Sequence, residues 1–199
     1  MQIDVLLYDG FDELDALGPF EVLANAGFDT ALVSLDGARP VTGSHGATVS
    51  ATSAPRGGDV LVVPGGGWND RSPRGARAEA GGPAMPAALR AAHEAGTTLA
   101  SVCTGGMLLA TAGLLTGRPA VTHHGAVDDL RAAGADVIAG ARVVDDGDIL
   151  SAGGVTSGID LALWIVEREL GTEAADRIAR EMEHERRGNV HVASPAAVK

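Results

Sequence analysis

Residues 97–109, Thr-Thr-Leu-Ala-Ser-Val-Cys-Thr-Gly-Gly-Met-Leu-Leu, contain the pattern that decides the fold. The first half is short, apolar and rich in β-branched residues, which predicts a buried strand. The second half opens with small residues and continues with good helix formers, which predicts a helix over residues 107–115. Cys103, the only cysteine in the chain, therefore lies at a sharp strand-to-helix junction.

The position of Cys103 predicts a reactive thiol. Backbone N–H groups at a helix N-terminus favour negative charge, so we expect the thiol to ionise below its usual pKa of about 8.5. Ser101 and Gly105 lie two residues away on either side, and such small residues suit the tight turn of a nucleophile elbow. The alternative is an inert buried thiol, which is the commonest state of an isolated cysteine.

Composition limits the class of protein. The chain has 199 residues and a formal net charge of −11 at pH 7. Its length predicts one domain over residues 1–188, followed by a C-terminal tail over residues 189–199. The acidic balance argues against nucleic acid and anionic membranes as partners. The sequence shows no leader-like opening, no apolar run of the roughly 18 residues that span a bilayer and no cysteine pair, so we expect a cytoplasmic location.

Strands and helices alternate along the predicted structure. The expected strands are residues 3–8, 30–35, 60–63, 97–102, 120–122, 142–144 and 149–151, with a small hairpin over 40–50. The expected helices are residues 13–24, 83–95, 107–115, 124–133, 159–170 and 172–187, and residues 68–82 are expected to be a surface loop. This alternation predicts a mostly parallel sheet with helices on both faces, an α/β fold of the flavodoxin-like type.

Residues with useful chemistry follow several of the predicted strands. Because ligand sites in such sheets form beyond the carboxyl ends of the strands, we expect these residues to meet in one crevice. The candidates are Asp15, Gly66, Gly67, Cys103, Thr104, His123, Gly154 and Thr156. No spacing of histidine, cysteine or carboxylate residues matches a usual metal site, and the glycines at 65–67 lack the Lys-Ser/Thr of a nucleotide loop, so we expect neither metal nor cofactor.

Five segments together resemble the DJ-1/PfpI superfamily, whose members have the class I glutamine amidotransferase-like fold. The segments are residues 10–19, 63–67, 101–105, 120–123 and 153–160. The combination of Leu-Asp-x-x-Gly-Pro from residue 14 with Ser-Val-Cys-Thr-Gly from residue 101 is most similar to the isocyanide (isonitrile) hydratase group. It also resembles the sensor domain of some AraC-type transcription regulators. This chain departs from the hydratases at Gly106, where they have serine, at His124, where they have tryptophan, and after the last helix, where they tend to continue.

The resemblance implies a role for each candidate residue. Cys103 would attack the carbon of an isocyanide, and Asp15, kept protonated by burial or a nearby anion, would supply a proton and then activate water. Thr104 would hydrogen-bond the acid or the water. The backbone N–H groups of Gly66, Gly67 and Thr104 would stabilise a developing anion. Around them would lie His123, Gly154 and Thr156. The resemblance also implies a homodimer that acts on a small molecule without a cofactor.

Other interpretations stay open from the sequence. Asp15 could instead cap the first helix, and His123 could be structural. A glyoxalase- or deglycase-like activity on reactive carbonyls is disfavoured because such members carry histidine after the cysteine or a glutamate on the first loop, where this chain has Thr104 and Asp15. A redox or ligand sensor would use the same thiol without turnover. A transcription regulator is disfavoured by the acidic charge and the lack of room for a helix-turn-helix domain.

Overall fold

A seven-stranded sheet forms the centre of the molecule in the computed structural model, which describes residues 1–193. From one edge to the other, its strands are β11 (Val190–Val192), β9 (Val143–Asp145), β10 (Ile149–Ala152), β6 (Thr98–Val102), β5 (Val60–Val63), β1 (Gln2–Leu6) and β2 (Asp29–Val33). The five strands from β10 to β2 run parallel, β9 is antiparallel to β10, and β11 is parallel to β9. The predicted mostly parallel sheet is therefore confirmed.

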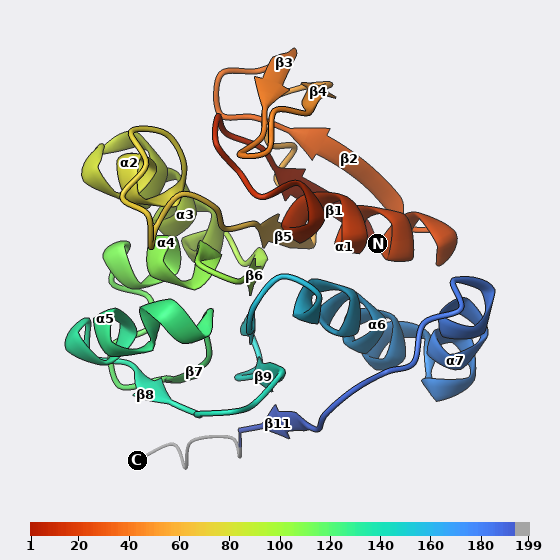
Figure 1. The fold of residues 1–199 in the computed structure, drawn as a ribbon. Helices are drawn as coiled ribbons and strands as arrows, with labels where there is room; N and C mark the ends of the chain where they lie inside the picture. Colours follow the sequence, from red (N-terminus) through yellow and green to blue (C-terminus); the bar gives the residue numbers. More distant parts are fainter. Residues whose placement is uncertain (194–199) are drawn as a thin grey trace.

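Helices cover both faces of this sheet, as predicted (Figure 1). One face is covered by α1 (Glu13–Asn25), α6 (Ser157–Leu170) and α7 (Thr172–Glu181). The other is covered by α2 (Ala76–Gly81), α3 (Ala84–Glu94), α4 (Gly105–Thr111) and α5 (Val127–Ala132). Smaller elements are the hairpin of β3 (Arg39–Thr42) and β4 (Thr48–Ala51), the pair β7 (Pro119–Ala120) and β8 (Asp136–Val137), and the 3₁₀ turn His124–Ala126. Strands β5 and β6 are almost fully buried, because both faces of a parallel sheet are covered.

Two parts of the sequence prediction need correction. Residues 68–82 are not one surface loop, because α2 occupies the second half of that segment. The tail expected from residue 189 begins with β11, which pairs with β9 at the edge of the sheet, and the rest of that tail, residues 194–199, lies outside the described residues. A strand of three residues is too short to show a period-2 pattern, and only Val190 of β11 packs against the core, so no local pattern predicts a strand here.

Pro19 lies in the interior of α1. It is inside the helix rather than in its first turn. Its missing N–H leaves the backbone carbonyl four residues earlier, that of Asp15, without its usual helical donor. The proline ring packs against α6, where a Cβ added to Gly158 would lie 3.2 Å from Pro19 Cγ. Close packing of the two helices thus compensates for the missing hydrogen bond and holds the start of α1 beside the start of α6.

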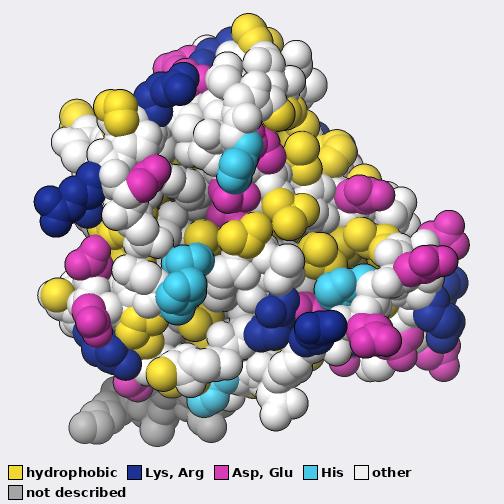
Figure 2. Space-filling model, viewed as in Figure 1, with side chains coloured by type: hydrophobic (Ala, Val, Ile, Leu, Met, Phe, Trp, Pro, Cys, Tyr) yellow, Lys and Arg dark blue, Asp and Glu magenta, His cyan; other side chains and the backbone are white. Residues whose placement is uncertain are grey.

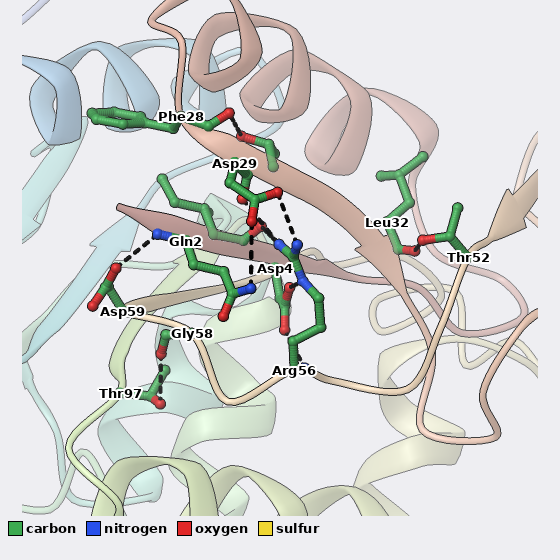
Figure 3. Close-up of polar contacts among 12 residues, drawn as sticks. Gln2, Asp4, Phe28, Asp29, Leu32, Thr52, Arg56, Gly58, Asp59 and Thr97 are labelled. Atoms are coloured by element: carbon green, nitrogen blue, oxygen red, sulfur yellow. Dashed lines mark hydrogen bonds and ion pairs between the residues drawn. The ribbon is translucent and has the colours of Figure 1, made fainter.

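A cluster of ion pairs fastens the segment before β5 to the first two strands (Figure 3). The Arg56 guanidinium donates to the buried carboxylate of Asp4, with an Nε–Oδ1 distance of 2.6 Å, and to Asp29, with an Nη1–Oδ1 distance of 2.9 Å. The same side chain also bonds the backbone carbonyls of Ile3 and Asp29. A buried carboxylate that is this fully paired has a structural role, so we do not count this cluster among the functional sites.

No helix within residues 1–193 is both long and apolar enough to cross a bilayer.

Candidate active site

Cys103 lies at the sharp turn between β6 and α4, so the structure confirms the predicted strand-to-helix junction. Its φ angle is +55°, a left-handed conformation that non-glycine residues rarely adopt. Its backbone N–H donates to the carbonyls of Ala152 and Gly153, at 3.1 and 2.9 Å, and its carbonyl accepts the Thr122 hydroxyl at 2.8 Å. Hydrogen bonds with three other residues therefore fix the backbone of Cys103. Such a strained, fully anchored residue is typical of a functional site.

Glycines make the elbow possible. A Cβ added to Gly105 would lie 2.1 Å from the Val63 carbonyl oxygen, and one added to Gly65 would lie 2.5 Å from the Thr104 backbone nitrogen. The chain after β5 and the start of α4 are therefore in direct backbone contact, which only residues without a side chain permit. This contact brings the loop at residues 64–67 against Cys103 and Thr104.

Thr104 ties the two segments together by its side chain. It is buried, and its Oγ1 accepts the N–H of Gly66 at 3.0 Å. The sequence predicted that the Gly66 N–H would stabilise an anion, but in this structure that N–H is already donated to Thr104, so the expected role would require the bond to break. The N–H of Gly67 has no protein partner among residues 1–193, and Gly67 lines the cavity above Cys103.

We predict that Thr104→Val destabilises the protein whereas Thr104→Ser does not. Valine removes the oxygen that accepts the Gly66 N–H and leaves a partly buried donor without a partner, which costs about 1–3 kcal/mol. Serine keeps the oxygen and loses only a methyl group. Urea unfolding of the two variants measures the difference, and equal free energies of unfolding would show that this hydrogen bond does not hold the loop.

Asp15 is fully buried and lies beside Cys103 rather than at the helix cap. The cap of α1 is Asp12, whose Oδ1 accepts the Leu14 N–H at 3.1 Å. Asp15 lies inside the helix, and its Oδ2 accepts the Gly65 N–H at 3.0 Å. Its Oδ1 has no hydrogen-bond partner among the described residues. The capping role left open for Asp15 is therefore wrong. Asp15 instead places a buried carboxyl, with one unpartnered oxygen, beside Cys103.

Burial raises the pKa of Asp15 to about 8, and the nearby carboxylate of Asp12 adds to this effect. The Gly65 N–H and contact with the Cys103 thiol offset part of the rise. A carboxyl is hard to ionise where it is desolvated and faces another negative charge. The expected protonated acid is thus available near neutral pH, and the anion that helps to keep it protonated is Asp12.

The Cys103 thiol has the opposite pKa shift from the one predicted. Burial, followed by the charge of Asp15, raises its pKa to about 12, although the backbone N–H groups of Val155 and Thr104 work in the other direction. The expectation of a lowered pKa rested only on the N-terminus of the helix that follows Cys103. It could not account for the helix α1 carboxyl or for the loop before α6, which together enclose the sulfur. In the folded protein Cys103 is therefore a protonated thiol at neutral pH.

His123 is held in one orientation at the side of the site. Its Nδ1 accepts two N–H groups, the side-chain amide of Asn69 and the backbone of Gly125, both at 3.1 Å. Two donors on Nδ1 leave no room for a proton there, so the neutral ring carries its hydrogen on Nε2. Burial and the adjacent His124 lower the pKa of His123, which favours this neutral form. Gly154 packs against the ring, since a Cβ there would lie 2.9 Å from His123 Cδ2.

Thr156 is the predicted site residue that the structure does not bring to Cys103. It is exposed before α6, and its hydroxyl accepts a hydrogen bond from Arg142 at 3.2 Å. The position that contacts the sulfur is its neighbour Val155, whose backbone has a φ angle of +28°. The predicted segment therefore does reach Cys103, but it contributes the backbone N–H of Val155 and not the polar side chain of Thr156.

A cavity of about 290 Å³ opens above Cys103. It is lined by Asp12, Ser44, His45, Gly66, Gly67, Trp68, Asn69, Asp70, Cys103, Thr104, His123 and Val155. A larger hollow of about 740 Å³ lies elsewhere, near Arg118 and Arg168, and its acidic groups are paired with these arginines. The smaller cavity contains Cys103, so we take it as the candidate active site.

Several residues of this site were not predicted. Tyr8 is buried below it, donates to the Pro64 carbonyl at 2.6 Å, and has a pKa raised well above its usual value by burial and by Asp15. Asp12, His45 and Asn69 come from loops whose positions depend on the assembled fold. Asp12 alone had a usable signal, because it precedes the first helix and lies three residues before Asp15.

Asp12, Glu13 and His45 form the one group within residues 1–193 whose ligand atoms lie close enough together to hold a metal ion. Glu13 Oε2 is 2.7 Å from His45 Nδ1, and Glu13 Oε1 accepts the backbone N–H groups of His45 and Ala47. These contacts pin the β3–β4 turn to the start of α1. They account for the Glu13 carboxylate without an ion, so we assign the group a structural role.

The sequence matches a known protein family. A model of the DJ-1/PfpI family matches residues 1–168, a range that includes the elbow, Asp15 and the loop around Val155. The chain belongs to the DJ-1/PfpI family.

Among DJ-1/PfpI relatives, an isonitrile hydratase from Pseudomonas putida is 33% identical over 92% of this chain and 78% of its own length. A deglycase from Thermococcus kodakarensis is 33% identical over 76% of this chain and 89% of its own. Among solved structures, a ThiJ/PfpI family protein from Pseudomonas syringae is 28% identical with a TM-score of 0.79, covering 92% of this chain and 75% of that one. Drosophila melanogaster DJ-1beta, at 22% identity and a TM-score of 0.80 over 93% of this chain and all of its own, shares the fold.

Proposed function

We propose that this protein hydrates isocyanides to N-substituted formamides, with Cys103 as the nucleophile and Asp15 as the proton carrier. One observation carries the proposal: a buried carboxyl with a raised pKa contacts the thiol of an elbow cysteine and has a free oxygen. Similarity to an isonitrile hydratase over 92% of the chain supports the same assignment.

The first step uses the proton of the thiol. When Asp15 is ionised, its carboxylate accepts the Cys103 proton as the sulfur attacks the terminal carbon of the isocyanide, R–N≡C. The same proton then passes to that carbon, giving the thioimidate R–N=CH–S–Cys103 and restoring the carboxylate. The pKa of the Cys103 thiol is about 12, so the thiol is protonated at neutral pH, and attack without such a base would be slow.

The second step uses water. The Asp15 carboxylate takes a proton from a water molecule as the oxygen adds to the thioimidate carbon, and the nitrogen gains a proton. The adduct R–NH–CH(OH)–S–Cys103 then collapses to the formamide R–NH–CHO, and the sulfur leaves as the thiol. Backbone N–H groups of Val155 and Thr104, which oppose the rise of the thiol pKa, would also stabilise the departing sulfur.

A second candidate is activity on reactive carbonyls, favoured by the similarity to a deglycase. Thr104 and Asp15 argue against it, because the carbonyl-directed members of the family described above carry histidine or glutamate at these places. A redox-sensor role is disfavoured by the raised thiol pKa, since the thiolate is the form that oxidises readily.

The test is steady-state hydration of para-nitrophenyl isocyanide by the wild type and by Cys103→Ala. We expect formamide production by the wild type and a loss of at least about a thousandfold in the variant, because covalent catalysis has no substitute nucleophile here. Thr111→Ala, a substitution on the exposed side of α4, is the matched control and should keep full activity. Equal rates in Cys103→Ala and the wild type would refute the mechanism. No turnover by the wild type, with Cys103 still alkylated, would direct the search to carbonyl substrates.

The homodimer implied by the family resemblance stays a prediction, which sedimentation of the purified protein tests.

A further inference from the structure

The cavity above Cys103 has an unbalanced charge. Its described lining includes two carboxylates, Asp12 and Asp70, and no lysine or arginine. Figure 2 shows acidic side chains beside a histidine where the β3–β4 hairpin meets the start of α1, and no Lys or Arg side chain lies between this histidine and the pair of histidines below it. A hollow lined by charge of one sign concentrates ligands of the other sign.

Asp12 is the fixed negative charge that faces the reacting groups. One of its oxygens accepts the Leu14 N–H, and the other has no hydrogen-bond partner among residues 1–193. The charge of Asp12 contributes to the raised pKa values of Asp15, Tyr8 and His45 and acts in the same direction on His123. Its field therefore reaches the buried base, the ring below the site and both histidines of the cavity.

The two histidines of the cavity lining do not cancel this field. His45 is paired with Glu13, so its positive form is neutralised locally. His123 is held in its neutral form by its two donors on Nδ1. Arg71, Arg74 and Arg77 follow Asp70 along the chain and are not part of the cavity lining. The Arg77 guanidinium lies 5.3 Å from the centre of the Trp68 ring, which does line the cavity, and is the positive charge that most directly opposes Asp12 there. The whole chain, with a net charge of −11, adds to the negative potential.

We propose that Asp12 makes this site select electrophiles that carry a positive charge, such as a protonated amine, over anionic ones. For isocyanides this inference rests on the proposed function. If the protein hydrates isocyanides, its preferred substrates are those with an ammonium substituent. The ammonium group would take the free oxygen of Asp12 while the isocyanide carbon reaches Cys103. Anionic substrates, including carboxylates and phosphates, would be repelled.

Asp12→Asn is a clean probe of this charge. Asparagine caps helices about as well as aspartate, so the variant should fold with the α1 cap intact. Asp176→Asn on α7 is the matched control, since it removes the same charge from an exposed position on a helix outside the cavity lining.

The first experiment needs no isocyanide. It compares the rates at which Cys103 reacts with a cationic, a neutral and an anionic methanethiosulfonate, carrying trimethylammonioethyl, methyl and sulfonatoethyl groups. A ratio between two reagents cancels any change in thiol nucleophilicity. Because any thiolate reacts faster with a cationic than with an anionic reagent, each cationic-to-anionic ratio is divided by the ratio for free 2-mercaptoethanol. We expect this normalised ratio to exceed about 10 in the wild type and in Asp176→Asn, and to fall severalfold in Asp12→Asn and at high salt. A wild-type ratio of one or less, or a ratio that Asp12→Asn leaves unchanged, overturns the proposal.

The second experiment measures kcat/KM for three aliphatic isocyanides of similar size with ammonium, methyl and carboxylate ends. The same order of preference, reduced in Asp12→Asn, extends the proposal to substrates. If none of the three is hydrated while the thiol-reagent ratios behave as expected, charge selection stands and the isocyanide assignment fails. If the isocyanides are hydrated with no preference for charge, the assignment stands and the role of Asp12 is refuted.

Discussion

Replacing Asp15 by Asn is expected to lower isocyanide hydration about a hundred- to ten-thousandfold while making the protein more stable at neutral pH. Catalysis is lost because asparagine can neither accept the Cys103 proton nor activate water. The wild-type rate should rise with pH through the Asp15 pKa of about 8, since the carboxylate is the form that accepts the proton. The variant should lack this inflection.

The gain in stability follows from the direction of the Asp15 pKa shift. In the unfolded chain an aspartate ionises with a pKa near 3.9, whereas in the folded protein the Asp15 pKa is about 8. Between these values the folded state holds a proton that the unfolded state has released. This group therefore contributes a stability that is highest below pH 4 and falls as the pH rises to about 8.

The size of the effect can be bounded from the same shift. At pH 7 the buried Asp15 lowers the free energy of unfolding by an amount that corresponds to about three pKa units, or at most roughly 4 kcal/mol. The Asp15→Asn variant should regain about 1–3 kcal/mol of this loss. Urea unfolding of both proteins at pH 4.5 and pH 7.5 measures this, and the difference between them cancels all other titrating groups. We expect the variant to be the more stable at pH 7.5 and the two to be nearly equal at pH 4.5.

Alkylation of Cys103 tests whether the Asp15→Asn variant keeps a reactive thiol. Because Asp15 contributes to the high thiol pKa, its removal lowers that pKa, and the thiol should react severalfold faster than the wild type at pH 9. An Asp15→Asn protein that keeps full activity, or that is less stable than the wild type at pH 7.5, would show that Asp15 is not a buried proton carrier.

Gly105→Ala is expected to abolish the elbow, whereas Gly106→Ala in the next position is expected to be harmless. The added methyl group at 105 would lie 2.1 Å from the Val63 carbonyl oxygen and 2.8 Å from that of Pro64, and both atoms are backbone that cannot move alone. At 106 the nearest atoms are 3.4 to 3.5 Å away, an ordinary contact. Alanine there also improves helix propensity by about 1 kcal/mol.

Free energies of unfolding separate the two variants. We expect Gly105→Ala to lose more than about 3 kcal/mol or to fail to fold, and Gly106→Ala to be within about 1 kcal/mol of the wild type. If Gly105→Ala is insoluble, the yield of soluble protein is compared between the two variants, and we expect it to be much lower for Gly105→Ala. Equal stability and equal Cys103 reactivity in the two variants would mean that backbone contact between residues 63 and 105 is not what forms the elbow.

Much of the fold could be predicted from local pattern. The strand before Cys103 and the helix after it are decided by a dozen consecutive residues, and the apolar run at 60–63 has the signature of a strand buried on both faces. The rule that sites lie beyond the carboxyl ends of parallel strands then placed Gly67, Cys103 and His123 around one crevice, where the structure has them.

What the sequence missed depends on contacts between distant segments. The thiol pKa moved up rather than down because α1 and the loop at 153–156 bury the sulfur, and no local pattern records that enclosure. The hydrogen bond between Asn69 and His123 joins residues 54 positions apart. Strand β11 is recognised only by its pairing with β9. Each case is one in which tertiary contact overrides local preference.

The bonds that hold the Cys103 backbone also make this thiol a reporter of folding. Its N–H and carbonyl are bound by residues that lie 19 to 50 positions further along the chain, so the elbow is complete only after those segments have assembled. Before then Cys103 is an ordinary cysteine, more acidic than in the native state, where its pKa is about 12. Quenched-flow labelling during refolding would therefore show the thiol becoming less reactive as the chain packs around it. The loss of Cys103 reactivity would mark the time at which the elbow forms.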